Sequence, residues 1–422
     1  MSIEKLIANK ITNPNNGDNN ISKPIVKIGI IGIVLGVSVM LLTLSIVLGF
    51  KNEIINKITG LTTHIAISNI NINPSNEPEP IRISADTLQL IKQLPNIKHI
   101  QATAFKNGIL KTETQNEGVI LKGVNKNYDF SFIKNYLQEG KLPNFTAIES
   151  SKEILISQGL ADKLDLKLNQ KLLIYFVSQH QVFDSTANEQ ITKYEQRSRS
   201  LTICGIFKTS FSDFDNNLTF VDLRQIQRLN YWDSSQVANY EIKVNDFEAN
   251  DATIVKVQDI LGYNYTVSSV REMYANIFIW LDKLDINGVI IIVLMVLVAT
   301  INMITALLIL ILERTNMIGL IKALGMSNSS VRKIFLFISL KLIGKGLFWG
   351  NIIGLGLCLI QQYFKLVKLD SETYYVEYVV VHINWFYVLL LNIGTFLTCL
   401  IMLFLPTLII TKLTPIKTLK FD

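Results

Sequence analysis

Residues 286–312 read INGVIIIVLMVLVATINMITALLILIL, a stretch that contains no charged side chain. A helix of about 20 apolar residues spans the hydrocarbon core of a bilayer, so this stretch is long enough to cross a membrane. Three further stretches meet the same criterion, namely Ile28–Phe50, Gly346–Phe364 and Ile383–Thr411. The sequence therefore predicts an α-helical integral membrane protein with four transmembrane helices.

The polar region between the first two stretches, residues 51–285, predicts one large extracytoplasmic domain. Runs of β-branched and aromatic residues alternate there with short helical patterns, so we expect an α+β domain with a mixed sheet. The expected strands lie in THIAISNINI, EGVILKGV, EILIS, KLLIYFVS, LTICGIF and NLTFVDL. The expected helices lie in SADTLQLIKQLPNIKHI, with Ser84 or Asp86 as its cap and a break at Pro95, and in SQGLADKLDL and LRQIQRLNYW.

Helical patterns also flank this domain on both sides. REMYANIFIWLDKLD, residues 271–285, runs into the second span, and KNEIINKI follows the first. One helical stripe of the former holds Met273, Ile277, Trp280, Leu281 and Leu284. Two interpretations stay open: either these segments extend the two spans outward and carry the domain, or they are amphipathic helices that pack against it.

Basic residues predict the orientation of the chain, because cytoplasmic loops collect Lys and Arg. They precede the first span, separate the second from the third and follow the fourth: Lys5, Lys10, Lys23, Lys27, Arg314, Lys322, Arg332, Lys333, Lys412, Lys417 and Lys420. We therefore expect cytoplasmic segments at 1–27, 313–330 and 412–422, and an extracytoplasmic loop at 365–382. The transmembrane helices would be 28–50, 286–312, 331–364 and 383–411, in the inner membrane with both termini cytoplasmic.

Several classes of function find no support in the sequence. Residues 51–285 are near neutral, so the net charge of +6 lies elsewhere and does not indicate nucleic acid binding. There is no phosphate-binding loop, no nucleophile elbow, and no metal-ligand spacing among the four histidines. We expect no catalytic residue, metal or cofactor in this chain. The first span is expected to be a retained anchor, because GFKNEIINK after it offers no cleavage site.

Glycines recur at helical spacing in two spans, and small residues allow transmembrane helices to approach closely. Gly32 and Gly36 lie in the first span, and Gly346, Gly350 and Gly354 in the third. Either these glycines make a close contact that slides or separates, or they serve static packing. Lys341 and Lys345 precede the third row; we expect them to be interfacial, the alternative being that they snorkel from within the membrane. No span contains an acidic residue, so ion-driven transport is not expected.

The segment after residue 312, ERTNMIGLIKALGMSNSS, predicts a short amphipathic helix over Glu313–Leu324. Met317, Ile318, Ile321 and Leu324 share one face, and Glu313, Arg314 and Lys322 are polar. Gly325 is expected to end the helix, and Ser327–Ser330 to cap the next one. Such a helix either lies on lipid or fills a groove in a partner that supplies energy.

ILERTNMIGLIKALGMSNSSVRKIF resembles the coupling segment of permeases in the MacB/FtsX-like superfamily of ABC transporters. The whole chain most closely resembles the lipoprotein-releasing (Lol-type) permeases of that superfamily. The resemblance also rests on GIVLGVSVMLLTLSIVLGFKNEIINKITGLTTHIAI, EGVILKGVNKNYDF, EILISQGLADKLDL, GIFKTSFSDFD and LTPIKTLKFD. These segments occur in the family's order and cover nearly the whole chain.

The resemblance implies a dimeric permease, either a homodimer or a heterodimer with a second permease, and a separate ABC ATPase that binds ATP and Mg. It implies that a coupling helix inserts into that ATPase. The implied contact residues are Glu313, Arg314, Met317, Ile318, Leu320, Ile321, Lys322, Ala323, Leu324 and Gly325. The implied cargo is a lipoprotein or another membrane-associated substrate.

One segment departs from the family pattern. Lol-type permeases that recruit a periplasmic carrier use a proline-containing hairpin, whereas VSQHQVFDSTANEQITKYEQRSRS has no proline here. Carrier recruitment is therefore not implied. Two other functions remain open, an FtsX-like regulator of a cell-wall hydrolase and an exporter of another substrate. The large outer domain favours transport, because that domain is usually small in such regulators.

Overall fold

A computed structural model of the chain describes residues 4–5, 7–8, 22–70, 78–112, 115–184, 189–403 and 406. The chain divides into two compact units. The transmembrane unit comprises Met1–Asn52, Trp280–Lys368 and Tyr378–Asp422, and the outer unit comprises Glu53–Ile279 and Leu369–Glu377. The predicted cytoplasmic tail 412–422 and most of the predicted segment 1–27 lie outside the described residues.

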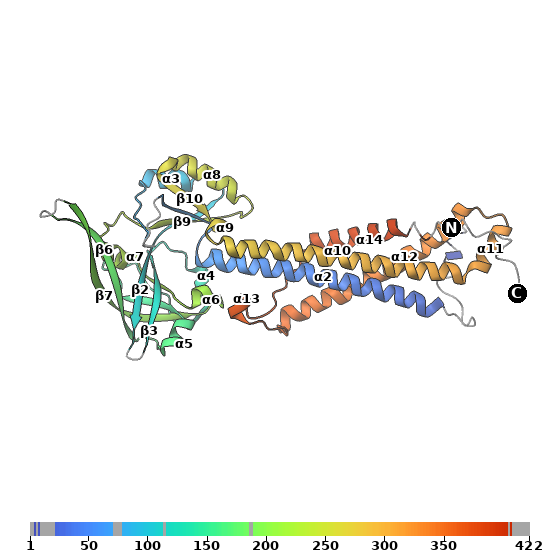
Figure 1. Cartoon of the computed structure of the whole chain (residues 1–422), viewed down its shortest axis with the longest axis horizontal. Helices are drawn as coiled ribbons and strands as arrows, with labels where there is room; N and C mark the ends of the chain where they lie inside the picture. The colour runs from blue at the N-terminus through green and yellow to red at the C-terminus, as the bar shows by residue number, and fades with distance from the viewer. Residues whose placement is uncertain are drawn as a thin grey trace. The chain divides into compact units, whose positions relative to one another are not determined.

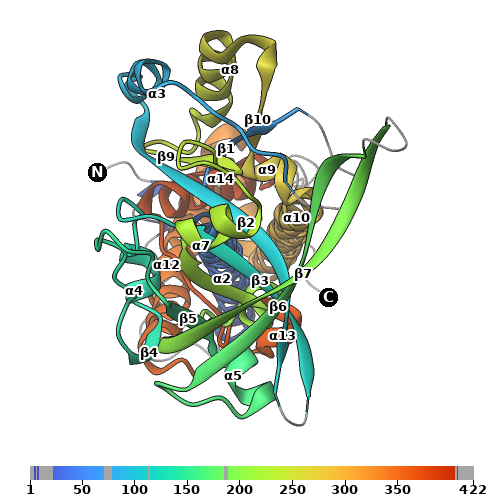
Figure 2. The ribbon, with the colours of Figure 1, turned by 90° about the vertical axis from the view of Figure 1, so that its left-hand side faces the viewer.

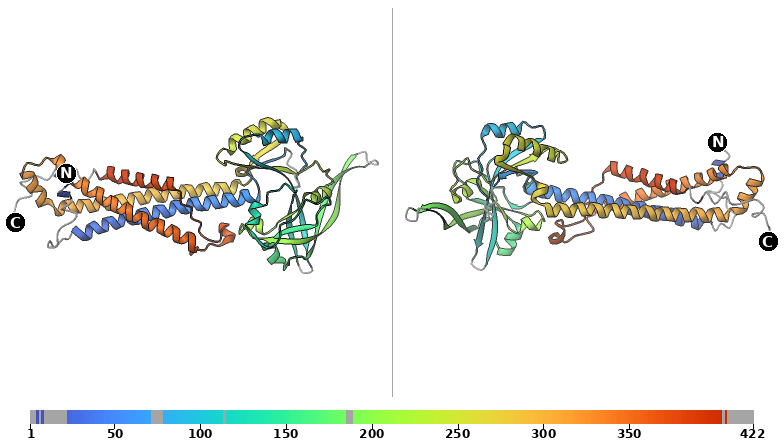
Figure 3. Two further views of the ribbon diagram at one scale, coloured as in Figure 1. Left: turned by 180° about the vertical axis from the view of Figure 1, so that it is seen from behind. Right: turned by 45° about the horizontal axis from the view of Figure 1, so that its top comes forward.

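Within the described residues, four helices are long and apolar enough to cross a membrane, which confirms the predicted fold class. They are α2 (Ser22–Leu61), α10 (Ala275–Glu313), α12 (Asn328–Phe364) and α14 (Trp385–Met402). Within the transmembrane unit these helices run side by side (Figures 1 and 3). From Gly346 to Phe364, α12 rises ~28 Å at about 1.5 Å per residue, so a bilayer core fits without including Lys341 or Lys345.

The segments that flank the outer domain are continuous with the spans. α2 runs unbroken to Leu61, and α10 begins at Ala275, well before the predicted span at 286. The predicted stripe on residues 271–285 is divided, because α9 (Val270–Met273) is a separate helix and the non-helical Tyr274 follows it. Both transmembrane helices therefore extend directly into the outer unit.

The outer unit is built on a ten-stranded sheet. Its strands are β1 (Ile65–Asn69), β2 (Ile97–Lys111), β3 (Asn116–Val124), β4 (Leu137–Gly140), β5 (Glu153–Ser157), β6 (Lys171–Asp184), β7 (Glu189–Phe207), β8 (Leu218–Asp222), β9 (Asn239–Val244) and β10 (Tyr265–Ser269). Its helices, besides the end of α2 and α9, are α3 (Ala85–Lys92), α4 (Ser131–Lys134), α5 (Gln158–Leu164), α6 (Ser212–Asp215), α7 (Leu223–Leu229), α8 (Asn250–Leu261), η1 (Gly262–Asn264) and α13 (Ser371–Tyr374).

The long strand β2 belongs to two sub-sheets. Its second half pairs with β3 and β6, and the order β2–β3–β8–β5–β7–β6 closes into a ring of strands. Its first half pairs with β9, which continues through β1 to β10 in antiparallel fashion. Helices α3 and α8 pack beside this smaller sheet (Figure 2). The outer unit thus has a ring lobe and a small-sheet lobe joined by β2.

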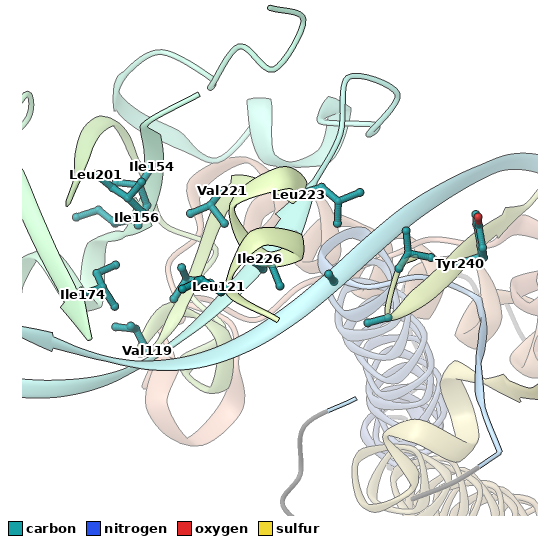
Figure 4. Close-up of a cluster of buried hydrophobic side chains, with 14 of the residues drawn as sticks. Val119, Leu121, Ile154, Ile156, Ile174, Leu201, Val221, Leu223, Ile226 and Tyr240 are labelled. Carbon is teal, nitrogen blue, oxygen red and sulfur yellow. The ribbon is translucent and has the colours of Figure 1, made fainter. Parts of the chain in front are cut away.

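Alternating apolar residues form the core of the ring lobe. Val119 and Leu121 of β3 and Ile154 and Ile156 of β5 are buried at alternate positions (Figure 4). The predicted strands in these segments are present. β2 was not predicted because its buried positions include the polar side chains Gln101, Thr103 and Lys106, which interrupt the apolar alternation.

The junction between α2 and β1 contains a histidine that resists protonation. His64 Nδ1 accepts the Val244 N–H at 3.0 Å, and its ring packs against Phe247. Burial, reinforced by Lys243 and Lys98, lowers the pKa of His64 to about 4 from 6.5. Protonation of this ring would also remove its acceptor nitrogen, so the folded outer unit keeps His64 neutral.

We expect the outer unit to lose stability as the pH falls from about 6.5 to about 4. In that window the unfolded chain binds a proton at His64 and the folded chain does not, which costs up to ~1.4 kcal/mol per pH unit. Above about pH 6.5 His64 is neutral in both states, so this loss of stability is absent. His64→Asn keeps a hydrogen-bond acceptor but has no titrating group. The loss of stability between pH 6.5 and 4 should therefore be smaller in this variant. Thermal unfolding of the full chain against pH tests this, and parallel curves for the two proteins would contradict it.

Candidate functional site

The segment between the second and third spans forms a helix with defined ends. α11 (Thr315–Ala323) is set off from α10 by the non-helical Arg314. Gly325 adopts a left-handed conformation with φ +93°, and its N–H donates to the Lys322 carbonyl at 3.0 Å. Ser327 Oγ accepts the Ser330 N–H and caps α12. The short helix, its glycine stop and the serine cap are all present, although the helix begins at Thr315 and not at Glu313.

The burial of α11 differs from the predicted apolar face. Ile318 is 0% exposed and belongs to the core of the transmembrane unit, together with Leu310 and Val331. By contrast, Leu320 is 55% and Leu324 81% exposed. Ile318 therefore holds α11 against its own unit, and the apolar surface left for a partner consists of Leu320 and Leu324. Sequence periodicity identifies a stripe but does not tell which neighbour covers it.

The remaining predicted contact residues lie around this surface. Glu313, Ala323 and Gly325 are exposed, and Arg314, Met317, Ile321 and Lys322 are half-buried. Ile321 packs partly against the same core as Ile318. Partial burial lowers the pKa of Lys322. The exposed side of α11 is thus an apolar pair bordered by charged groups.

The five glycines that were predicted to pack helices lie at close contacts between spans. A Cβ added at Gly346 or Gly350 of α12 would lie 2.5 Å from Ile33 or 2.8 Å from Val37 of α2, respectively. Gly354 faces Leu41 in the same way, at 3.0 Å. On α2, Gly32 faces Asn302 and Gly36 faces Ala299, both on α10. α2 is therefore held closely on two sides, by α12 and by α10.

Polar contacts between the spans were not predicted. Ser38 Oγ donates to the Gly350 carbonyl at 3.0 Å, which links α2 to α12. Asn351 of α12 and Asn392 of α14 exchange two hydrogen bonds, at 2.6 and 2.9 Å. Such bonds hold helices together where no water competes. The signal was available, since Asn351 and Asn392 are isolated amides in apolar runs.

The connector between the third and fourth spans, Leu369–Glu377, is part of the outer unit. The Tyr375 ring stacks on Phe211 with centroids 4.3 Å apart, and Lys57 Nζ of α2 donates to the Tyr375 carbonyl at 3.0 Å. Glu377 pairs with Lys208 at 2.6 Å and accepts from Ser210 at 2.9 Å. These two hydrogen bonds lower the pKa of Glu377. The connector, predicted only as a loop, thus docks on the outer domain.

We expect Tyr375→Asn to release the connector. Tyr375 has a φ of +60°, a conformation that Asn tolerates, so this change removes the ring without adding backbone strain. Removing the stacked ring and its buried surface should destabilise the docked connector by ~1–2 kcal/mol. Amide exchange of 370–377 should then become about tenfold faster. Tyr374→Asn is the matched control, because Tyr374 is 43% exposed. Equal exchange in the two variants would contradict the docked connector.

Among the residues that the structure describes, no group of three or more His, Cys, Asp or Glu side chains is placed to hold a metal ion. A cavity of about 910 Å³ opens between α3, β2 and α7 in the outer unit. Its lining combines apolar side chains, among them Leu88, Ile100, Leu223 and Tyr240, with several amides and Lys92.

Comparison with known proteins assigns the family. Residues 28–260 match the MacB-like periplasmic core domain, and residues 289–415 match the FtsX-like permease C-terminal domain. The lipoprotein-releasing system transmembrane protein LolE of Haemophilus influenzae is 23% identical, over 94% of each chain. LolC of Buchnera aphidicola is 25% identical, over 88% of this chain and 90% of that one.

Among solved structures, the periplasmic region of MacB from Actinobacillus actinomycetemcomitans aligns at 12% identity with a TM-score of 0.34. It covers 51% of this chain and 92% of that one. The two domain matches together account for most of the sequence, and the Lol proteins match it nearly end to end. The chain therefore belongs to the FtsX-like permeases of ABC transporters that carry a MacB-like periplasmic core domain, with the lipoprotein-releasing transmembrane proteins among its relatives.

Proposed function

We propose that this chain is the permease subunit of a complex in which a separate ABC ATPase drives release of lipoproteins from the inner membrane. The observation that carries the proposal is α11, a helix with fixed ends between two spans that exposes Leu320 and Leu324. The basic residues around it favour the cytoplasmic side, where an ATPase would bind. The similarity to LolE and LolC supports lipoproteins as cargo.

Motion would pass from the ATPase into the spans through α11. Ile318 packs in one core with residues of α10 and α12, so a push on α11 acts on the ends of both helices. The close glycine contacts then bring α2 into the movement, and α2 continues unbroken into the outer unit. This chain contributes no ATP or Mg site to the proposal; both would be bound by the ATPase.

The cargo explains why energy is needed. Each CH₂ buried in a bilayer contributes about 0.8 kcal/mol, so a lipid anchor with three chains is held by tens of kcal/mol. Spontaneous release at that cost would be very slow. ATP-driven movement of the outer unit would lower the barrier for extraction. A second permease chain, either a copy or a relative, would complete the complex.

Transfer of the released lipoprotein to a carrier is not part of the function proposed for this chain. β6 and β7 pair as antiparallel neighbours, and the segment 177–200 contains no proline. Residues 185–188 lie outside the described residues.

Reconstitution tests the proposal directly. The chain is co-purified with its ATPase and permease partner and placed in proteoliposomes that contain a triacylated lipoprotein. ATP should move lipoprotein into the soluble fraction in the presence of an amphiphile acceptor, and a non-hydrolysable analogue should not. ATP-stimulated cell-wall hydrolysis without lipoprotein release would instead support the regulator of a hydrolase, and release of a soluble peptide alone would support an exporter.

A further inference from the structure

A buried lysine joins three elements of the outer unit. The side chain of Lys122 on β3 is 1% exposed, and its Nζ lies 2.8 Å from a carboxylate oxygen of Glu241 on β9, which is 3% exposed. The same Nζ donates to the carbonyl of Leu61 at 3.0 Å. Leu61 is the last residue of α2. One ammonium therefore connects the ring lobe, the small-sheet lobe and the end of a transmembrane helix.

The surroundings fix both charges in place. The rings of Phe105 and Tyr128 lie 5.6 and 5.2 Å from Lys122 Nζ. Gln101 Nε2 of β2 donates to Glu241 at 2.9 Å, and Gln101 Oε1 accepts the Asp129 N–H at 3.0 Å. Asp129 pairs in turn with Lys243 at 3.0 Å. Glu241, to which the ammonium bonds, is thus itself held by Gln101 and the neighbouring pair.

Stability alone is a poor reason for such a pair. Desolvation offsets much of the attraction between buried charges, and apolar replacements of a whole pair are often neutral or stabilising. The hydrogen bond to Leu61 serves a purpose other than stability. The last carbonyls of a helix are unsatisfied and carry partial negative charge, which an ammonium satisfies. Here that ammonium belongs to the sheet, so the bond ties helix to sheet.

We propose that Lys122 is a positioning residue that fixes the outer end of α2 to the sheet, so that movement of this transmembrane helix displaces β3 and β9 together. The inference rests on the proposed function, because it gives α2 the task of carrying motion to the outer unit. Its partner in that task is Glu241, which holds the ammonium toward the Leu61 carbonyl.

The test uses the full chain in its complex with the ATPase and a variant without the buried charges. Lys122→Met/Glu241→Gln removes both charges and keeps an amide oxygen for Gln101. Lys243→Met/Asp129→Asn is the matched control, since it neutralises the adjoining pair of the same network. In that pair, Lys243 bonds to Asp129 and not to α2.

Two measurements are made on each protein besides its unfolding temperature. The first is the number of lipoproteins released per ATP hydrolysed, which should fall about fivefold or more in the Lys122 variant and not in the control. The second is the distance between spin labels on the exposed residues Asn56 of α2 and Lys126 after β3. The distribution of this distance should stay narrow through the nucleotide cycle in the wild type and the control, and it should broaden in the Lys122 variant.

The outcomes separate the two proposals. If no protein releases lipoprotein, the proposed function fails, while the label distances still report on the role of Lys122. A Lys122 variant that folds, couples and keeps a narrow distance overturns the inference. If that variant unfolds, Lys122→Glu/Glu241→Lys retains the ion pair without a donor on β3 for Leu61. Wild-type coupling in the swapped protein, or loss of its fold as well, would make Lys122 merely structural and also overturn the inference.

Discussion

Leu320→Asp/Leu324→Asp is expected to strip the ATPase from the purified complex while the permease remains folded in the membrane. Both side chains are largely exposed, so the permease itself loses little packing when they change. An interface residue that acts as a hot spot costs about 2 kcal/mol or more when truncated, and we expect both leucines to act in this way. Together they should weaken binding by ~4 kcal/mol, close to a thousandfold. Co-purification of the ATPase and its turnover in the complex measure the loss.

Three neighbouring substitutions make this result specific. Ser329→Asp adds a charge at an exposed position of α12 near α11 and should leave the ATPase bound. Glu313→Ala should weaken binding only slightly, because an exposed ion pair is worth ~0–1 kcal/mol. Ile318→Asp buries an unpaired carboxylate and should therefore lower the amount of permease that folds. Full retention of the ATPase by the double leucine variant would show that α11 lies on lipid.

The behaviour of Ile318 shows how far sequence reasoning reaches at this site. Helical periodicity places Met317, Ile318, Ile321 and Leu324 together, and it also predicts the stop at Gly325. Periodicity carries no information on what covers the face. In the structure Ile318 is buried in one core with residues of α10 and α12, and Leu320 and Leu324 are the exposed apolar side chains of this segment. The helix was predictable, whereas its division into an inward and an outward face depends on tertiary contacts.

The same limit applies to the outer unit. Strands with apolar alternation, such as EILIS and NLTFVDL, were predicted and are present as β5 and β8. β2, β9 and β10 were not predicted, because polar residues occupy many of their positions. In β2 and β9 those residues include Gln101, Glu241 and Lys243 of the buried network. A strand that buries charge cannot be read from hydrophobic pattern, since its partners lie on other strands.

Long-range pairing also explains why the connector was missed. SETYYVE carries no periodicity that indicates docking, and its contacts lie far away in sequence, at Lys57, Lys208 and Phe211. The glycines of α12 are the opposite case. Their spacing alone indicated close approach, because nothing but a neighbouring helix benefits from a row without side chains.

Gly350→Ala is expected to disrupt the transmembrane unit, whereas Gly356→Ala on the same helix should be harmless. An added Cβ at Gly350 would lie 2.8 Å from the Val37 Cβ and 3.2 Å from the Val34 carbonyl. The backbone of α2 cannot yield locally, so the two helices must separate and the Ser38–Gly350 hydrogen bond must lengthen. Overpacking of this kind costs about 1–3 kcal/mol or more.

Gly356 provides the matched control, since nothing lies within 4 Å of a Cβ built there. Alanine is a better helix former than glycine by up to ~1 kcal/mol, so the control should be neutral or slightly stabilised. Val37→Gly removes the atoms that the new methyl group meets, and it should restore part of the stability of Gly350→Ala. Thermal unfolding in detergent and assembly with the ATPase measure both effects. Equal behaviour of the two alanine variants would mean that α2 and α12 are not held at the distance the structure shows, and that the glycine row does not govern how these spans move.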